Sequence, residues 1–207
     1  RLCVAVVAIR SRRGSPIQPP IDGNPRQKEN AGARENIIHE LTRMVSVGIF
    51  VREPVPGRVK RRLAKDIGDE RACDLYASFI RRTLILARSS RLPLHIYITP
   101  PEAVSRVRRR FRIQDPVSPQ RGRTLGDRMR NAFRDLLAVS PTAILIGSDS
   151  PTLPPQFLRR AALLLRRYDL VLGPAEDGGY VLIGLTAAGF LKAATTLFSN
   201  LPWGTST

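Results

Sequence analysis

The sequence predicts an α/β protein, a three-layer α/β/α sandwich built around a mostly parallel sheet. Short apolar runs alternate with segments of helical periodicity from residue 44 onward. This pattern is typical of strands connected by crossover helices. The run at 142–146 is almost continuously apolar, as expected for a central strand that helices cover on both faces.

The elements of the first half follow from periodicity. Residues 45–51 form an apolar run that ends at the Pro- and Gly-containing loop 52–57, which predicts a strand followed by a loop. Residues 69–89 repeat apolar side chains at three- and four-residue steps, which predicts a long helix with one buried face. Further along we expect a strand at 94–99, a short basic helix at 102–110 and an extended segment at 111–117.

The second half continues the alternation. Residues 124–139 carry an apolar face at helical spacing, which predicts an amphipathic helix. The buried strand at 142–146 follows it. We then expect a helix at 155–167, strands at 170–173 and 180–185 around a turn at 174–179, a helix at 186–199 and a final loop.

The N-terminal segment differs from this body. Residues 11–36 are rich in Pro, Gly, Asn and charge, so they bury too little apolar surface to offset their conformational entropy. Met44 directly precedes the first expected strand. We therefore expect residues 1–43 to be a disordered or non-native extension, residues 44–207 to form one domain, and Met44 to be the natural start. N-terminal sequencing of the native protein tests this hypothesis.

Composition narrows the class of protein. No apolar run reaches the length of about 18 residues that a membrane span needs. Cys3 and Cys73 form neither a metal-ligand spacing nor a disulfide framework, which favours a cytoplasmic protein. The net charge is +17, and 30 of the 34 basic residues are arginine. A polyanionic partner and arginine-rich codon usage both explain this charge. Because basic and aromatic residues do not interleave, nucleic acid is not the favoured partner.

Three segments follow expected strands and hold polar residues, at the edge of the sheet where α/β proteins bind ligands. In the first, Gly57 permits close backbone approach, and Lys60, Arg61 and Arg62 begin a possible helix. Fixed cations at a helix start favour an anion. The spacing differs from the GxxxxGK[ST] phosphate loop. A solvated basic surface is the alternative.

The second segment, Gly147-Ser148-Asp149-Ser150-Pro151, follows the buried strand. One carboxylate there suits Mg²⁺ or Mn²⁺ bound to a diphosphate, because such ions take their other ligands from phosphate and water. A helix-capping turn is the alternative.

In the third segment, Glu176 and Asp177 precede Gly178, Gly179 and Tyr180. A carboxylate there suits an acceptor base, and a structural hairpin turn explains the same residues equally well. The two histidines, His39 and His95, indicate neither a hydrolase triad nor a histidine-ligated zinc site.

Taken in order, these motifs resemble a bacterial glycosyltransferase-like family of the GT-A superfamily. Some of its members are assigned to arsenosugar biosynthesis, and the wider superfamily includes molybdenum-cofactor guanylyltransferases. The resemblance covers roughly residues 46–206. It rests on FVREPVPGRVKRRLA (50–64), GDERACDLYASFIRRTL (68–84), QRGRTLGDRMRNAF (120–133), LIGSDSPTLP (145–154), VLGPAEDGGYVLIGL (171–185) and LFSNLPWGTS (197–206).

The resemblance implies a metal-dependent transferase with a nucleotide-sugar donor and a small-molecule acceptor. Asp149 would bind Mg²⁺ or Mn²⁺, and Asp177, then Glu176, would act as the acceptor base. The expected nucleotide-binding residues are Pro54, Gly57, Lys60, Arg62, Leu63, Gly126 and Arg128. The expected acceptor-binding residues are Gly178, Gly179, Tyr180 and Trp203.

The sequence also departs from the family pattern. Arg61 stands where a threonine is usual and Arg52 where a lysine is usual, so the positive charge is kept. Relatives continue past the Trp-Gly segment with further elements. Three alternatives therefore remain: a nucleotidyltransferase that transfers NMP from an NTP, a non-catalytic nucleic-acid-binding protein, and a truncated, inactive relative that still binds nucleotide.

Overall fold

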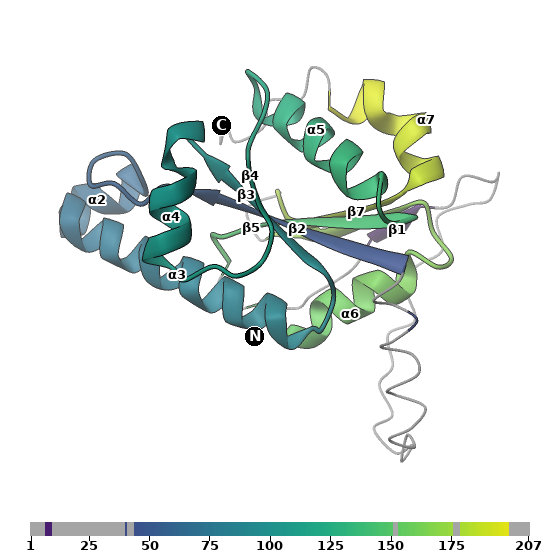
Figure 1. Cartoon of the computed structure of the whole chain (residues 1–207), viewed down its shortest axis with the longest axis horizontal. Coiled ribbons are helices and arrows are strands. Elements are labelled where there is room, and N and C mark those ends of the chain that lie inside the picture. The colour runs from purple at the N-terminus through teal and green to yellow at the C-terminus, as the bar shows by residue number, and fades with distance from the viewer. Residues whose placement is uncertain (1–6, 10–39, 41–43, 151–152, 176–178, 199–207) are drawn as a thin grey trace, which may run out of the picture.

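A seven-stranded mixed sheet forms the centre of the computed structural model (Figure 1). The structure describes residues 7–9, 40, 44–150, 153–175 and 179–198. Within these residues the strands are β1 (Val7–Ile9), β2 (Val45–Arg52), β3 (Leu94–Thr99), β4 (Val117–Pro119), β5 (Thr142–Gly147), β6 (Leu170–Pro174) and β7 (Tyr180–Thr186). Their order across the sheet is β1-β6-β7-β5-β2-β3-β4.

The strand directions confirm the expected α/β class with a mostly parallel sheet. β5, β2, β3 and β4 pair in parallel. β7 pairs antiparallel with both β5 and β6, and β1 pairs antiparallel with β6. Five of the seven strands therefore share one direction, and only β7 and β1 oppose it.

Helices cover both faces of the sheet, which makes three layers. α5 and α7 lie on one face, and α3 and α6 lie on the other (Figure 1). The helices are α2 (Arg61–Ile67), α3 (Asp69–Ser89), the 3-10 turn η1 (Pro101–Ala103), α4 (Val104–Arg110), α5 (Leu125–Leu137), α6 (Pro155–Leu164) and α7 (Ala187–Leu197). None of the described helices is long and apolar enough to cross a membrane.

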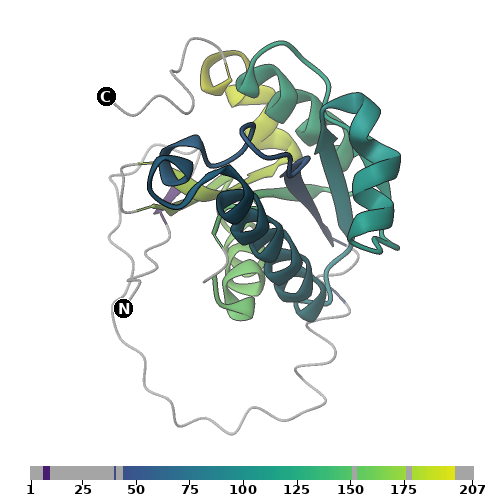
Figure 2. The same cartoon turned by 90° about the vertical axis from the view of Figure 1, so that its left-hand side faces the viewer.

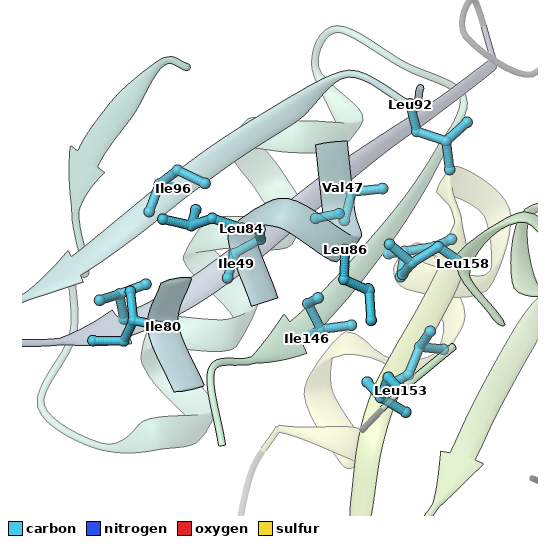
Figure 3. Packing of buried hydrophobic residues seen from close by; sticks show 14 of the residues in the cluster. Val47, Ile49, Ile80, Leu84, Leu86, Leu92, Ile96, Ile146, Leu153 and Leu158 are labelled. Atoms are coloured by element: carbon cyan, nitrogen blue, oxygen red, sulfur yellow. The ribbon is translucent and has the colours of Figure 1, made fainter. Parts of the chain in front are cut away.

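The pleat of the strands divides the core into two clusters. Alternate residues of β2, including Val47 and Ile49, pack against α3 and α6 (Figure 3), because successive strand side chains point to opposite faces. Gly48 faces α5 instead. A Cβ there would lie 2.7 Å from Leu145 Cδ1 and 2.9 Å from Leu136 Cδ1, so a larger residue would require these leucine side chains to move.

Most expected elements are confirmed, and those at 69–89 and 94–99 have the same bounds. Two expectations need correction. Residues 111–116 form a turn and coil rather than an extended segment, and only β4 beyond them is a strand. The helix expected at 155–167 ends at Leu164. Its last residues close a turn instead, with hydrogen bonds such as that from Arg167 N to Leu164 O at 2.9 Å.

The structure describes four residues before Met44, at positions 7–9 and 40. Val7–Ile9 forms the edge strand β1, in register with Leu170–Leu172 of β6. Glu40 forms an ion pair with Arg166 of 3.1 Å. These residues therefore contact the domain. Residues 10–39 and 41–43 lie outside the described residues, and the proposed start at Met44 stays a prediction.

Candidate functional site

The carboxyl ends of β2, β3 and β5 meet at one edge of the sheet. Arg52 at the end of β2 is in register with Thr99 at the end of β3, and Phe50 is in register with Gly147 of β5. The loops that follow these strands therefore emerge side by side. Figure 2 looks onto this edge, with α2 and α3 toward the viewer.

An ion pair joins the first two candidate segments. Lys60 Nζ lies 3.0 Å from Asp149 Oδ1, although the two residues are 89 positions apart. The Asp149 side chain is 64% exposed and that of Lys60 is 28% exposed. An ion pair this accessible to water stabilises the protein little, so both charges are free to exchange partners with a ligand.

Aromatic rings hold the Lys60 side chain in place. Its ammonium lies 5.8 Å from the ring centroid of Tyr76 and 5.6 Å from that of Phe79, both on α3. These distances are typical of cation–π contacts. Lys60 itself is the N-cap of α2, with φ 48° and ψ 40°. The ammonium is therefore positioned by α3 as well as by its own loop.

Tyr76 connects the two loops at the floor of the site. Its hydroxyl oxygen accepts a hydrogen bond from Arg52 N at 3.1 Å and lies 2.8 Å from Ser148 Oγ in a second hydrogen bond. Burial raises the pKa of Tyr76, so the hydroxyl stays protonated at neutral pH. The sequence pattern showed Tyr76 only as part of an apolar helix face. The feature of the sequence that could have identified Tyr76 as a site residue was its hydroxyl, because a buried tyrosine needs a hydrogen-bond partner.

The loop after β2 contains Pro54 and Gly57. Gly57 has φ 73°, a left-handed conformation that favours glycine, and the turn closes with a hydrogen bond from Arg58 N to Val55 O at 3.0 Å. The Pro54 carbonyl accepts a hydrogen bond from Arg110 Nη1 at 3.0 Å. This loop is therefore a defined turn held by α4.

Glu53 adds a second tie between the loop and α4. Arg106 donates to both of its carboxylate oxygens, at 2.7 and 3.0 Å. These hydrogen bonds lower the pKa of Glu53 below its usual value, so the carboxylate stays charged.

Arg128 reaches the same edge from α5. Its Nη1 donates to Thr99 Oγ1 at 3.3 Å and its Nε donates to the Gly122 carbonyl at 3.0 Å. Gly126 is buried in the first turn of the same helix. Arg62 is exposed on α2. The structure thus brings Arg128 to the end of β3, beside the strand that carries the Lys60 loop.

Only part of the third segment lies within the described residues. Glu176, Asp177, Gly178 and Trp203 lie outside them. Ala175 N donates to the Gly179 carbonyl at 2.9 Å. The Tyr180 hydroxyl donates to Met129 Sδ of α5 at 3.8 Å, and burial raises the pKa of this tyrosine. Because β7 runs opposite to β5 and β6, the last residues of β6 and the first residues of β7 lie at the same edge as Asp149.

The donor atoms near Asp149 fit one kind of metal ion. Across the described part of the chain, no three His, Cys, Asp or Glu side chains cluster as a metal site. Asp149 offers one carboxylate oxygen beyond the one that pairs with Lys60. This set suits an oxygen-liganded cation that takes most of its ligands from a diphosphate and water, and it excludes a closed all-protein cage formed by the described residues.

The fold and this edge define an α/β protein of GT-A-like architecture. Residues 83–205 match the family described as "Uncharacterized protein conserved in bacteria (DUF2064)". The chain belongs to this family. No curated protein matches the sequence.

Two solved structures share the architecture. The first is a protein from Desulfovibrio desulfuricans G20, provisionally named a nucleotide-diphospho-sugar transferase. It is 32% identical, with a TM-score of 0.72 over 78% of this chain and 70% of that one. The second is 4-diphosphocytidyl-2C-methyl-D-erythritol synthase from Anaerococcus prevotii DSM 20548. It is 9% identical, with a TM-score of 0.51 over 80% of this chain and 81% of that one, and it shows the fold alone.

Proposed function

We propose that this protein is a transferase that binds a nucleoside-diphosphate sugar where β2, β3 and β5 end. The Lys60–Asp149 ion pair of 3.0 Å carries the proposal. It joins the loop assigned to the nucleotide with the residue assigned to the metal. The provisional transferase name of the 32% identical relative supports the same class.

The residues at this edge have complementary roles. When the donor binds, the Lys60 ammonium leaves Asp149 for a phosphate oxygen and stabilises the negative charge that develops there. Arg62 and Arg128 add positive charge, and Gly57 allows the nucleotide to approach the backbone. Pro54 and Gly126 are assigned to the same nucleotide site by the family resemblance.

Asp149, once released by Lys60, would hold Mg²⁺ or Mn²⁺. Such an ion would supply Lewis-acid stabilisation of the departing diphosphate, in addition to the charge of Lys60.

The acceptor side of the proposal rests on the turn between β6 and β7. Asp177, and after it Glu176, would take the proton of a small-molecule acceptor hydroxyl. Gly178 and Gly179 leave space for the acceptor, and Tyr180 and Trp203 flank it. The last residues of β6 and the first residues of β7 lie at the same edge as Asp149, which supports the assignment.

Calorimetric titration tests the donor site. Wild type and Asp149→Ala are titrated with a panel of nucleoside diphosphates, with and without Mn²⁺. We expect one diphosphate to bind in a metal-dependent manner and the substitution to abolish the metal dependence. Asp115→Asn is the matched control, because Asp115 pairs with Arg88 at 2.7 Å, outside the proposed site, and should leave binding unchanged.

Other outcomes contradict the proposal and identify its alternatives. Pyrophosphate release from a nucleoside triphosphate would assign a nucleotidyltransferase. Nucleotide binding without turnover of any sugar donor would indicate an inactive relative. Salt-sensitive binding of oligonucleotides that survives Asp149→Ala would indicate a nucleic-acid-binding protein.

A further inference from the structure

A cavity of about 560 Å³, open to solvent, lies beside α4. Its lining contains three arginines, two uncharged polar residues and one isoleucine: Ser105, Arg108, Arg109, Arg112, Ile113 and Gln114. It shares no residue with the proposed donor site. Its volume falls within the range of about 300–1,000 Å³ that is typical of small-molecule sites.

The arginines of α4 and of the turn after it have two roles. Arg106 and Arg110, four residues apart, bond to Glu53 and to the Pro54 carbonyl, so they hold the loop after β2. Arg108 and Arg109 on α4, and Arg112 two residues after its end, line the cavity.

The cavity-lining arginines have few partners of their own. Arg108 Nε donates to the Ile113 carbonyl at 3.3 Å. The side chains of Arg109 and Arg112 make no hydrogen bond or ion pair with any residue that the structure describes. No carboxylate lines the cavity. Three guanidinium groups thus gather without a counter-charge, an arrangement that a multiply charged anion would stabilise.

Arg112 reaches the cavity through a backbone conformation that usually selects glycine. Ile113 N donates to Arg108 O at 3.0 Å and Arg112 N to Arg109 O at 3.2 Å, which is the Schellman pattern. Arg112 occupies its left-handed position with φ 48°, where a side chain is strained. The end of α4 therefore fixes the backbone from which the Arg112 side chain extends.

We propose that this cavity binds the phosphate group of a small molecule. Guanidinium groups match phosphate oxygens with paired hydrogen bonds, and Ser105 and Gln114 supply further polar contacts. The lining contains no aromatic residue, which favours a small ligand over single-stranded nucleic acid, since the latter needs an extended basic groove with stacking rings. The site is independent of the proposed donor site.

Binding of inorganic pyrophosphate, measured by calorimetry, tests the proposal. All proteins carry Lys60→Ala, so that the donor site does not contribute. We expect Arg109→Gln and Arg112→Gly each to weaken binding by about tenfold, as for the loss of a hydrogen bond between charged groups. Glycine suits the backbone at position 112, so Arg112→Gly should not lower Tm.

Arg91→Gly is the matched control. Arg91 also has positive φ, 61°, lies after α3 and does not line the cavity. This variant loses the same charge from the same conformation and should bind pyrophosphate within about twofold of its parent, since only general electrostatics change. Equal weakening by Arg91→Gly, no saturable binding by the parent, or tighter binding of a short oligonucleotide would each overturn the proposal.

Discussion

Tyr76 shows how a single buried hydroxyl organises the candidate site. It bonds to Arg52 N and to Ser148 Oγ, and its ring contacts Lys60. We expect Tyr76→Phe to lower the free energy of unfolding by about 2 kcal/mol, because two buried polar groups lose a partner. Diphosphate binding should weaken about fivefold, the equivalent of ~1 kcal/mol. Urea unfolding and calorimetry measure the two effects.

Tyr97→Phe provides the control for this prediction. The Tyr97 hydroxyl donates to the Ala132 carbonyl at 3.3 Å within the second core cluster, away from the Lys60 loop. The substitution should reduce stability by about 1 kcal/mol and leave diphosphate binding unchanged. Similar loss of binding in both variants would show that Tyr76 acts only through stability.

The pKa of His95 leads to a prediction of how the free energy of unfolding depends on pH. Burial lowers the pKa of His95 below its ordinary value of 6.5, and the nearby Asp135 carboxylate opposes this effect. The unfolded chain therefore takes up the proton first as the pH falls through 6.5, so the free energy of unfolding should decrease below that pH. Urea unfolding between about pH 7.5 and 5.5, above the range where carboxylates titrate, measures the decrease.

Two substitutions assign this pH dependence. His95→Gln should remove it, because glutamine does not titrate. His39→Gln changes the only other histidine of the chain and should keep it. A decrease that persists in His95→Gln would contradict the prediction.

Among the helices, α5 carries Arg128 of the candidate site and begins with a capping box. Asp127 N donates to Thr124 Oγ1 at 3.0 Å, and Thr124 N donates to Asp127 Oδ2 at 3.2 Å. Thr124→Ala should cost about 1 kcal/mol of stability, and Thr124→Ser should retain the cap. Thermal unfolding of both variants checks this, and equal Tm values for the two would contradict it.

The elements were largely predictable because their periodicity is local. The apolar face of 69–89 and the continuous run at 142–146 require no knowledge of distant residues. β1 was not predicted, because a three-residue strand carries no periodicity and depends on pairing with β6. The turn at 111–116 was mistaken for extended chain, since the left-handed conformation of Arg112 is unusual for arginine.

The sequence predicted the segments that form the candidate site, but not which of their residues contact one another. The positions of Lys60 and Asp149 after apolar runs indicated ligand-binding loops. Their direct contact depends on the order of β5 and β2 in the sheet, which no local pattern contains. The same applies to Arg128 and Thr99. Tyr76 was missed because its helical spacing alone also explains it as core.

For the whole molecule, β1 has a consequence for solubility. It occupies the outer side of β6, whose backbone N–H and C=O groups would otherwise stand open beside a largely apolar strand. Open strands of this kind template pairing between chains. A variant that starts at Met44 should therefore self-associate with increasing concentration, while the full chain at equal concentration does not. Size-exclusion chromatography with light scattering distinguishes a monomer from an associated form of each protein. A monomeric variant would show that β1 is not needed to prevent β6 from pairing between chains. If the shortened variant does self-associate, the pairing of Val7–Ile9 with β6 contributes to keeping the protein dispersed.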